Sequence, residues 1–203
     1  MKDETQRLEI YKNCMKQIKE RIALTDQSLT EWREKNVATT YSCEAAALQL
    51  RKIYELIAFS AMSADLEKYS SVRMEFSEDW RFADILKTIE QENRYFLPQP
   101  TRRVQSTVEG VNWHIEERPE AKLSKEDLIF RYKQLHKIMH AENPFAEPYS
   151  RHQYLIRIDT WVREVGGLLA EHRYVIGPMQ QGYIVELNDH GEDVTAFRVD
   201  LVG

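Results

Sequence analysis

Apolar side chains recur at alternating spacings of three and four residues along the first part of the chain, from about residue 4 to residue 35. Because residues three and four apart share one face of an α-helix, this spacing predicts a long helix with one apolar face. A kink near Thr25 and Asp26 fits the same pattern, since both residue types favour helix caps. The apolar stripe consists of Leu8, Tyr11, Met15, Ile18, Ile22, Thr25, Leu29 and Trp32.

A second helix is predicted after Thr39 or Thr40, either of which can cap it. Its residues are apolar on most sides through Met62, which is typical of a central helix that other helices surround. The polar exceptions lie on one side of this helix and include Arg51 and Glu55.

Three further helices are predicted from capping serines that precede apolar runs. In the second of these helices, Ser124 and Asp127 have the spacing of a capping box, in which side chains and backbone N–H groups bond reciprocally. Gly166 and Gly167 weaken the end of the third. The predicted helices follow Ser77 from about residue 78 to 95, Ser124 to about residue 141, and Ser150 through residue 169.

In two parts of the chain apolar residues alternate with polar ones, so the pattern repeats every second residue. Residues 101–116 alternate on both sides of Glu109 and Gly110, which indicates a β-hairpin or an irregular excursion. Near the C-terminus, three short apolar runs separated by turn residues predict an antiparallel β-meander. We therefore expect a mainly α fold: a helical bundle over residues 1–172, with a small β-meander over residues 173–203 packed on it.

The composition is typical of a folded, soluble protein with one core. The chain has 203 residues, of which 42% are hydrophobic and 30% are charged. A net charge of −5 gives no general attraction to nucleic acid or anionic membranes, so a site for a polyanion must be local. The charged N-terminus, and the shortness of the most apolar stretch at residues 53–62, favour a cytoplasmic protein that does not enter a membrane.

Cysteines, tryptophans and a pair of arginines add further expectations. Cys14 and Cys43 lie on different predicted helices without zinc-site spacing, so we expect buried free thiols. Arg102 and Arg103 make the middle segment locally basic, which fits a solvated loop or a loop that contacts RNA. The tryptophans fall on apolar faces or on an alternating strand, which favours core packing over base stacking. They are Trp32, Trp80, Trp113 and Trp161.

The helix after Ser124 carries the most suggestive chemistry. His136 and His140 are four residues apart and share a face, which the candidate substrate-binding residues Lys133 and Lys137 make positive. Such a histidine pair can chelate zinc, but the chain has no HExxH motif and no obvious third ligand. We therefore expect neither a metal nor another cofactor.

Arg131 precedes His136 with a spacer of four residues, and this pattern resembles the arginine–spacer–histidine motif of the HEPN superfamily of helical domains. The resemblance implies an HEPN-like bundle that acts as a metal-independent endoribonuclease. His136 would then exchange protons with the ribose 2′-hydroxyl or the leaving 5′-oxygen, and Arg131 would stabilise charge growing on the phosphate. A homodimer is also implied, because family members usually bring these residues together across a symmetric interface.

Two longer strings, residues 45–57 and 135–145, resemble uncharacterised bacterial proteins of about this length. His140 and Asn143 carry that pattern and would complete the site. These strings imply no activity of their own, whereas the HEPN resemblance implies a ribonuclease of the bacterial toxin or anti-phage defence type. Its substrate would be RNA, and its partner a cognate antitoxin or another defence-system protein.

Two questions stay open at this level. Arg51 and Glu55 can form a buried ion pair that fixes helix register, or Arg51 can enter the same cleft as His136 or His140 and bind phosphate. The rival to a ribonuclease is a non-catalytic helical module whose apolar faces dimerise or hold a protein partner, and whose meander offers an edge strand for pairing.

Overall fold

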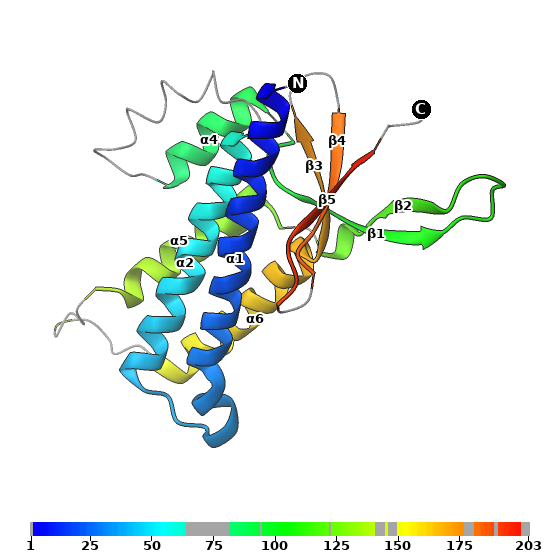
Figure 1. Ribbon diagram of the computed structural model, residues 1–203. Coiled ribbons are helices and arrows are strands. Elements are labelled where there is room, and N and C mark those ends of the chain that lie inside the picture. The colour runs from blue at the N-terminus through cyan, green and yellow to red at the C-terminus, as the bar shows by residue number, and fades with distance from the viewer. Residues whose placement is uncertain are drawn as a thin grey trace.

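The first two helices form the spine of the molecule. In the computed structural model α1 (Lys2–Lys35) and α2 (Thr40–Met62) lie side by side and run antiparallel (Figure 1). The structure describes residues 2–63, 82–93, 95–121, 123–140, 145, 150–176, 181–188 and 191–199.

The predicted apolar stripe of α1 is confirmed. Met15, Ile18 and Leu29 are fully buried against the rest of the bundle. The helix passes through Thr25 without interruption, and the Thr25 hydroxyl donates to the carbonyl oxygen of Arg21 at 2.8 Å. A threonine that bonds back into its own helix does not cap a new one, so no second helix begins here.

α2 begins at Thr39, one of the two caps that the sequence offers. The Thr39 side chain accepts a hydrogen bond from the Ser42 N–H, and the Ser42 side chain accepts one from the Thr39 N–H. Leu50, Leu56 and Ala58 point in different directions around the helix, and all three are buried. The prediction of a central helix is confirmed, since α1, α4, α5 and α6 all pack against α2.

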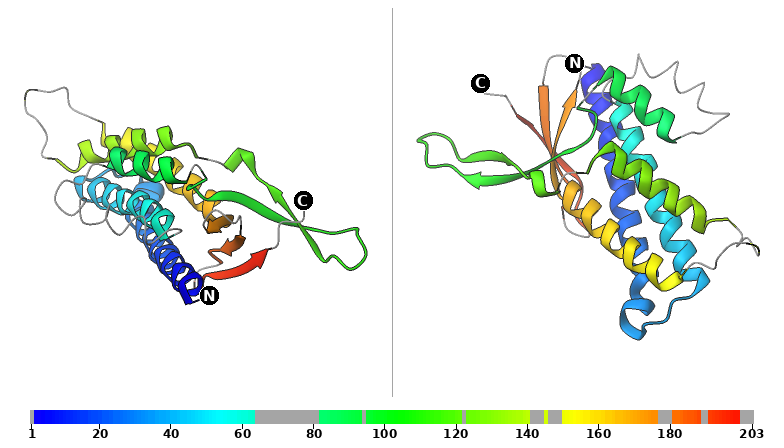
Figure 2. Two further views of the ribbon diagram at one scale, coloured as in Figure 1. Left: turned by 90° about the horizontal axis from the view of Figure 1, so that it is seen from above. Right: turned by 180° about the vertical axis from the view of Figure 1, so that it is seen from behind.

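Three further helices pack across the α1–α2 pair (Figure 2): α4 (Phe82–Glu92), α5 (Lys125–Ile138) and α6 (Arg151–Leu169). The predicted cap Ser77 and residues 78–81 lie outside the described residues. α4 ends before the predicted limit at residue 95, and α5 ends before residue 141.

The caps of α5 and α6 are those that the sequence predicts. Ser124 and Asp127 form the capping box of α5, and the Ser150 side chain accepts a hydrogen bond from the backbone of Gln153 at the start of α6. α6 continues through its two glycines to Leu169. Local capping chemistry therefore sets where both helices begin.

The predicted hairpin and the predicted meander are both present, and they form one sheet. Neighbouring strands are antiparallel, and their order in the sheet is β2-β1-β3-β4-β5. The hairpin joins the meander because Gln99 and Pro100 of β1 pair with Arg173 and His172 of β3. The strands are β1 (Gln99–Gln105), β2 (Trp113–Glu117), β3 (Glu171–Ile176), β4 (Gln181–Glu186) and β5 (Thr195–Val199), and a short 3-10 helix, η2 (Pro119–Ala121), follows β2.

One face of the meander packs on α1 through buried polar residues. The Tyr11 ring stacks on Tyr174 with ring centres 3.7 Å apart, and the Tyr174 hydroxyl bonds to that of Ser63 at 2.7 Å. His172 is fully buried, with Nδ1 3.0 Å from the carbonyl oxygen of Leu169 and Nε2 2.7 Å from the Tyr11 hydroxyl. Because a carbonyl only accepts, Nδ1 carries the hydrogen and Nε2 accepts from tyrosine.

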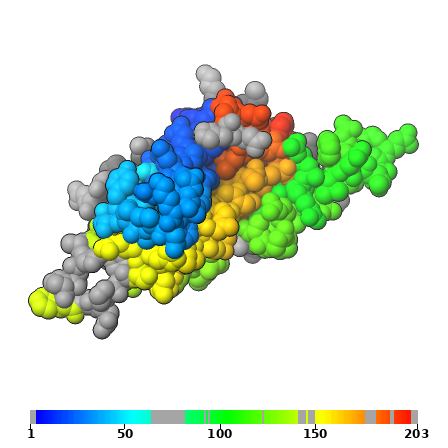
Figure 3. All heavy atoms as spheres, turned by 90° about the horizontal axis from the view of Figure 1, so that it is seen from below, coloured from blue at the N-terminus to red at the C-terminus, as the bar shows by residue number. Residues whose placement is uncertain are grey.

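The β1–β2 hairpin protrudes from the body of the molecule as an arm (Figures 1 and 3). Arg102 and Arg103 lie on β1 and form ion pairs with glutamates rather than lying in a loop. Trp113 is 56% exposed, so the expectation of core packing is wrong for this residue, because none of the described helices packs on its strand, whose five residues are all exposed. It holds for Trp161, which is buried, while Trp80 lies outside the described residues.

Two remaining expectations concern membranes and thiols. Among the helices that the structure describes, none has a stretch long and apolar enough to cross a membrane. Cys14 and Cys43 are buried and free, as predicted. Burial raises the pKa of each thiol to about 11, so neither is a reactive thiolate at neutral pH.

Candidate functional site

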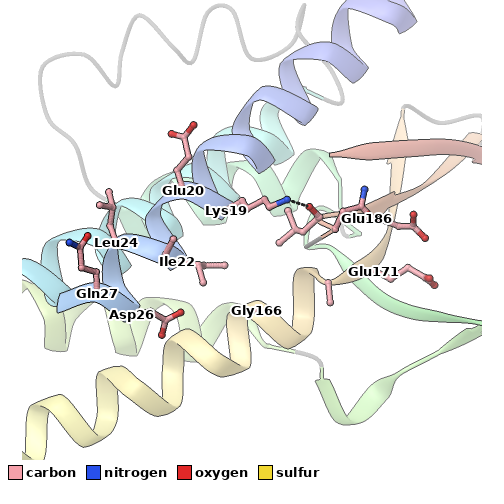
Figure 4. Close-up of a pocket in the computed structure, with 13 residues that line it drawn as sticks. Lys19, Glu20, Ile22, Leu24, Asp26, Gln27, Gly166, Glu171 and Glu186 are labelled. Atoms are coloured by element: carbon pink, nitrogen blue, oxygen red, sulfur yellow. Dashed lines mark hydrogen bonds between the residues drawn. The ribbon is translucent and has the colours of Figure 1, made fainter. Parts of the chain in front are cut away.

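A wide groove on one side of the molecule does not hold the predicted site. It has a volume of about 1040 Å³ and lies between α1, the end of α6 and strands β3 and β4 (Figure 4). Lys19 crosses it to donate to the carbonyl oxygen of Leu187 at 2.8 Å, and Glu171 and Glu186 pair with Arg103. None of the described residues that line it is a histidine, the side chain most often used for acid–base chemistry at neutral pH.

A smaller pocket, of about 450 Å³, lies where α5 meets α2 and α4. α5 turns Leu128, Leu135 and Ile138 into the bundle, and this fixes the rotation of the helix about its axis. Its lysines and histidines therefore remain on the exposed face. The described residues that line the pocket are Arg51, Phe82, Ala83, Ile129, Tyr132, Lys133, His136 and Lys137.

Arg51 reaches the pocket from α2. Its Nε donates to Glu55 Oε1 at 3.1 Å and to the Tyr132 hydroxyl at 2.9 Å, and that hydroxyl donates to Glu55 at 2.8 Å. Held in this way, Arg51 places Nη1 3.3 Å from His136 Nδ1. The two interpretations of Arg51 are therefore combined: it forms the ion pair with Glu55 and also enters the same pocket as His136.

His136 and His140 contact one another directly. Their Nε2 atoms are 2.9 Å apart and the ring planes stand nearly perpendicular, at 85°. Since arginine only donates, Nδ1 of His136 is an acceptor, and the hydrogen of the neutral ring lies on Nε2. His136 thus donates to Nε2 of His140, and Arg51 sets the direction of the hydrogen bond between the two rings.

The pKa of His136 lies below the usual value of 6.5. Partial removal of the ring from water is the largest cause, followed by the charge that His140 can carry and by the positive charge of Arg51. A second proton on His136 would occupy Nδ1 and face the guanidinium. These surroundings therefore favour the neutral form of His136, the form that can accept a proton.

The electrostatics of the pocket favour an anion. Arg51, Lys133 and Lys137 line it, and no carboxylate is among the described lining residues, although the whole chain has a net charge of −5. Glu55 lies behind Arg51 and bonds to it, so it orients the guanidinium instead of occupying the pocket. Because the chain as a whole is negatively charged, a site for a polyanion must be local, and this pocket is locally positive.

Arg131 is held in a different place from His136. Five residues along a helix correspond to a rotation of roughly 140°, so the two side chains leave different faces of α5. Arg131 is buried between helices, where Nη1 pairs with Glu164 of α6 at 2.6 Å and the guanidinium lies 5.6 Å from the centre of the Trp161 ring. Its role as the phosphate stabiliser stays a prediction, but the structure brings Arg51 and not Arg131 to His136.

The remaining predicted site residues have mixed outcomes. Lys133, Lys137 and His140 lie with His136 on the exposed face, as their spacing predicts. Asn143 lies outside the described residues. The structure thus brings together five of the seven predicted residues, all except Arg131 and Asn143: Arg51, Lys133, His136, Lys137 and His140.

Sequence reasoning missed three aromatic residues at this site. Tyr132 orients Arg51 through its hydroxyl, and its ring stacks on Phe82 of α4 at 4.2 Å between centres. Phe130 is 57% exposed on α5, and its spacing of three and seven residues from Lys133 and Lys137 places it beside them. That spacing was readable from the sequence, whereas the stacking of Tyr132 on Phe82 depends on the packing of two helices.

No group of three or more His, Cys, Asp or Glu side chains within the described parts of the chain could hold a metal ion. Comparison of the chain with family models, curated proteins and solved structures gave no match. Any function must therefore be argued from the site itself.

Proposed function

We propose that the protein is a metal-independent endoribonuclease whose site consists of Arg51, His136 and His140. The observation that carries this proposal is the 3.3 Å contact of Arg51 Nη1 with His136, whose own partner is His140 at 2.9 Å. An arginine beside two imidazoles supplies the groups that phosphodiester transfer needs: a fixed cation for the phosphate, a proton acceptor and a proton donor.

The chemistry follows from the direction of the histidine hydrogen bond. When RNA enters, this bond opens and leaves an unprotonated Nε2 on His140 to take the proton of the ribose 2′-hydroxyl. The 2′-oxygen then bonds to phosphorus as the bond to the 5′-oxygen breaks, and the histidine pair returns one proton to that oxygen. The products are a 2′,3′-cyclic phosphate and a 5′-hydroxyl, and Arg51 stabilises the additional negative charge in the transition state.

The exposed face of α5 supports single-stranded RNA as the substrate. Lys133 and Lys137 can contact phosphates on either side of the scissile bond, and the exposed ring of Phe130 offers a surface for one base. Because stacking tolerates every base and lysine contacts are not base-specific, we expect little sequence preference from these residues.

The test is cleavage of total RNA by purified protein in EDTA, with the product ends identified. We expect wild-type protein to produce 2′,3′-cyclic phosphate ends, and His136→Ala and His140→Ala each to lower the rate by roughly 10²- to 10⁴-fold. His114→Ala is the matched control, because this exposed histidine bonds to Ser106 on the hairpin, far from the site. Equal cleavage by all four proteins would indicate a contaminant.

A well-folded wild-type protein that cleaves no RNA and does not bind it would contradict the proposal. The rival function, a non-catalytic protein-binding module, would then take its place. Thermal unfolding of each variant, followed by circular dichroism, verifies that a loss of activity is not a loss of structure.

A further inference from the structure

No strand among the described residues pairs with the outer edge of β2. β2 is the last strand in the sheet order, and all five of its residues are exposed. It lies on the protruding arm, at the opposite end of the molecule from the C-terminal end of α5 (Figures 1 and 2). An exposed edge strand presents unpaired N–H and C=O groups and is a ready template for another strand.

The hydrogen bonds between β1 and β2 show which backbone groups point outward. Ser106 N–H donates to the Asn112 oxygen, and Arg118 N–H donates to the Pro100 oxygen. Hydrogen-bonded and non-bonded pairs alternate in an antiparallel ladder, so His114 and Glu116 face β1 with their backbone groups. The N–H and C=O groups of the residues between and beside them, Trp113, Ile115 and Glu117, therefore point away from the sheet.

We infer that β2 pairs with β2 of a second copy of this chain, antiparallel, about a two-fold axis at Ile115. In this register Ile115 bonds to its own counterpart, and Trp113 bonds to the partner's Glu117. All the outward backbone groups of the strand are satisfied, which amounts to three bonded residue pairs. A symmetric dimer of this kind uses one surface twice.

The side chains fit the same register. On one face Ile115 meets its counterpart, and Trp113 lies diagonally beside it, so side chains that are 40% and 56% exposed in one copy cover one another. On the other face His114 lies opposite the partner's Glu116, so the carboxylates of the two copies are not directly opposite one another. Glu116 also accepts from Arg102 at 2.8 Å, which keeps its carboxylate on that face.

Neighbouring registers are worse. An axis at Glu116 would place the carboxylate of each copy against that of the other, and an axis at His114 would place two histidines together. The charge pattern of the five residues therefore selects a second copy with its axis at Ile115. This inference is independent of the proposed function, because the interface is remote from the histidine pair and its test involves no RNA.

The first measurement is the molar mass of wild-type protein by sedimentation over a range of concentrations, beside Ile115→Lys and Val111→Lys. We expect a concentration-dependent dimer that Ile115→Lys weakens at least about tenfold, because two lysines would meet at the axis. Val111→Lys is matched to it, since Val111 is 41% exposed on the same arm and Ile115 40%. The Val111→Lys variant should dimerise as the wild type does.

The second measurement tests the register by oxidising cysteine variants. Bonded antiparallel residues have Cα atoms roughly 5.5 Å apart, within disulfide range, so Ile115→Cys should link two copies. Val111→Cys should not, because its two copies would lie roughly 27 Å apart at 3.3 Å per residue. The native Cys14 and Cys43 are buried and do not compete.

Three results would overturn the inference. One is a wild-type protein that stays monomeric at all concentrations, which would leave the β2 edge to a strand of a different protein. Another is a dimer that Ile115→Lys does not weaken although the variant is folded. The third is disulfide linkage of Val111→Cys that equals or exceeds that of Ile115→Cys.

Discussion

Two regions of the molecule hold histidines in opposite settings. At the junction of the sheet and α1, His172 is fully buried and both ring nitrogens have partners, Leu169 and Tyr11. At the end of α5, His136 and His140 are exposed and bond to one another. Both His172 and His136 have a pKa below the usual 6.5, with loss of water around the ring as the largest cause.

The difference lies in what else surrounds each ring. Around His172 the partners are neutral and enclosed, so the low pKa, about 4, affects folding and no substrate can reach the ring. Around His136 the neighbours include Arg51 and a second histidine beside an open pocket. A lowered histidine pKa therefore indicates a functional site only together with access and a charged partner.

The largest expected effect is on the rate of RNA cleavage, and it should differ between the two arginines near α5, Arg51 and Arg131. Arg51→Met should lower the rate of RNA cleavage by roughly 10²- to 10³-fold, because the transition-state charge loses its fixed cation. Arg131→Met should leave the rate per folded molecule unchanged, since Arg131 pairs with Glu164 on another face of the helix. Initial rates measured at equal concentrations of folded protein check this. Loss of activity in Arg131→Met alone would instead support the arginine of the HEPN-like motif.

The next effect is the dependence of stability on pH through His172. The unfolded ring binds a proton below about pH 6.5, whereas the folded ring does so only below about pH 4. Stability should therefore fall by about 3 kcal/mol as pH decreases through this window. The comparison is with His172→Gln, which retains an amide for hydrogen bonding but does not titrate.

Urea unfolding of both proteins at pH 7 and pH 4 gives the free energy of unfolding that each protein loses between the two pH values. The difference between these two losses measures the contribution of His172. The wild type should lose about 3 kcal/mol more than His172→Gln between the two pH values. Equal losses would show that other groups, and not His172, cause the acid sensitivity.

A smaller effect concerns the buried arginine. Arg131→Met should lower the free energy of unfolding by about 2 kcal/mol, because the ion pair is lost while the half-exposed Glu164 can return to water. Arg163→Met is the control, since Arg163 is 68% exposed and its partner Asp159 keeps a second ion pair with Arg33. Its cost should be about 0.5 kcal/mol or less. Similar losses in the two variants would contradict a structural role specific to Arg131.

The smallest effect is on the titration of His136. Removing the guanidinium in Arg51→Met should raise the pKa of His136, because a second proton on Nδ1 would no longer face a positive charge. NMR titration of the imidazole signals in wild type and variant measures the change, with His114 as the internal reference. An unchanged or lower pKa in the variant would mean that Arg51 does not control the histidine pair.

Much of the fold could be predicted because its signals are local. The capping boxes at Thr39 and Ser124 involve residues only three positions apart, and the helices begin where they predict. The helix ends were less accurate, since fewer residues mark them. Trp113 was misjudged because alternation identifies a strand but does not show whether anything covers it.

For the site, sequence alone determined which residues share the exposed face of α5, because a period of 3.6 residues places Lys133, His136 and Lys137 together. Only the tertiary structure decided which arginine joins them. Arg51 and His136 are 85 positions apart, and their contact depends on how α5 is rotated and packed against α2. The joining of the hairpin and the meander into one sheet likewise depends on residues far apart in the sequence, since β1 pairs with β3. Short-range patterns specify helices, caps and turns, whereas contacts between distant segments follow from how the apolar faces pack together.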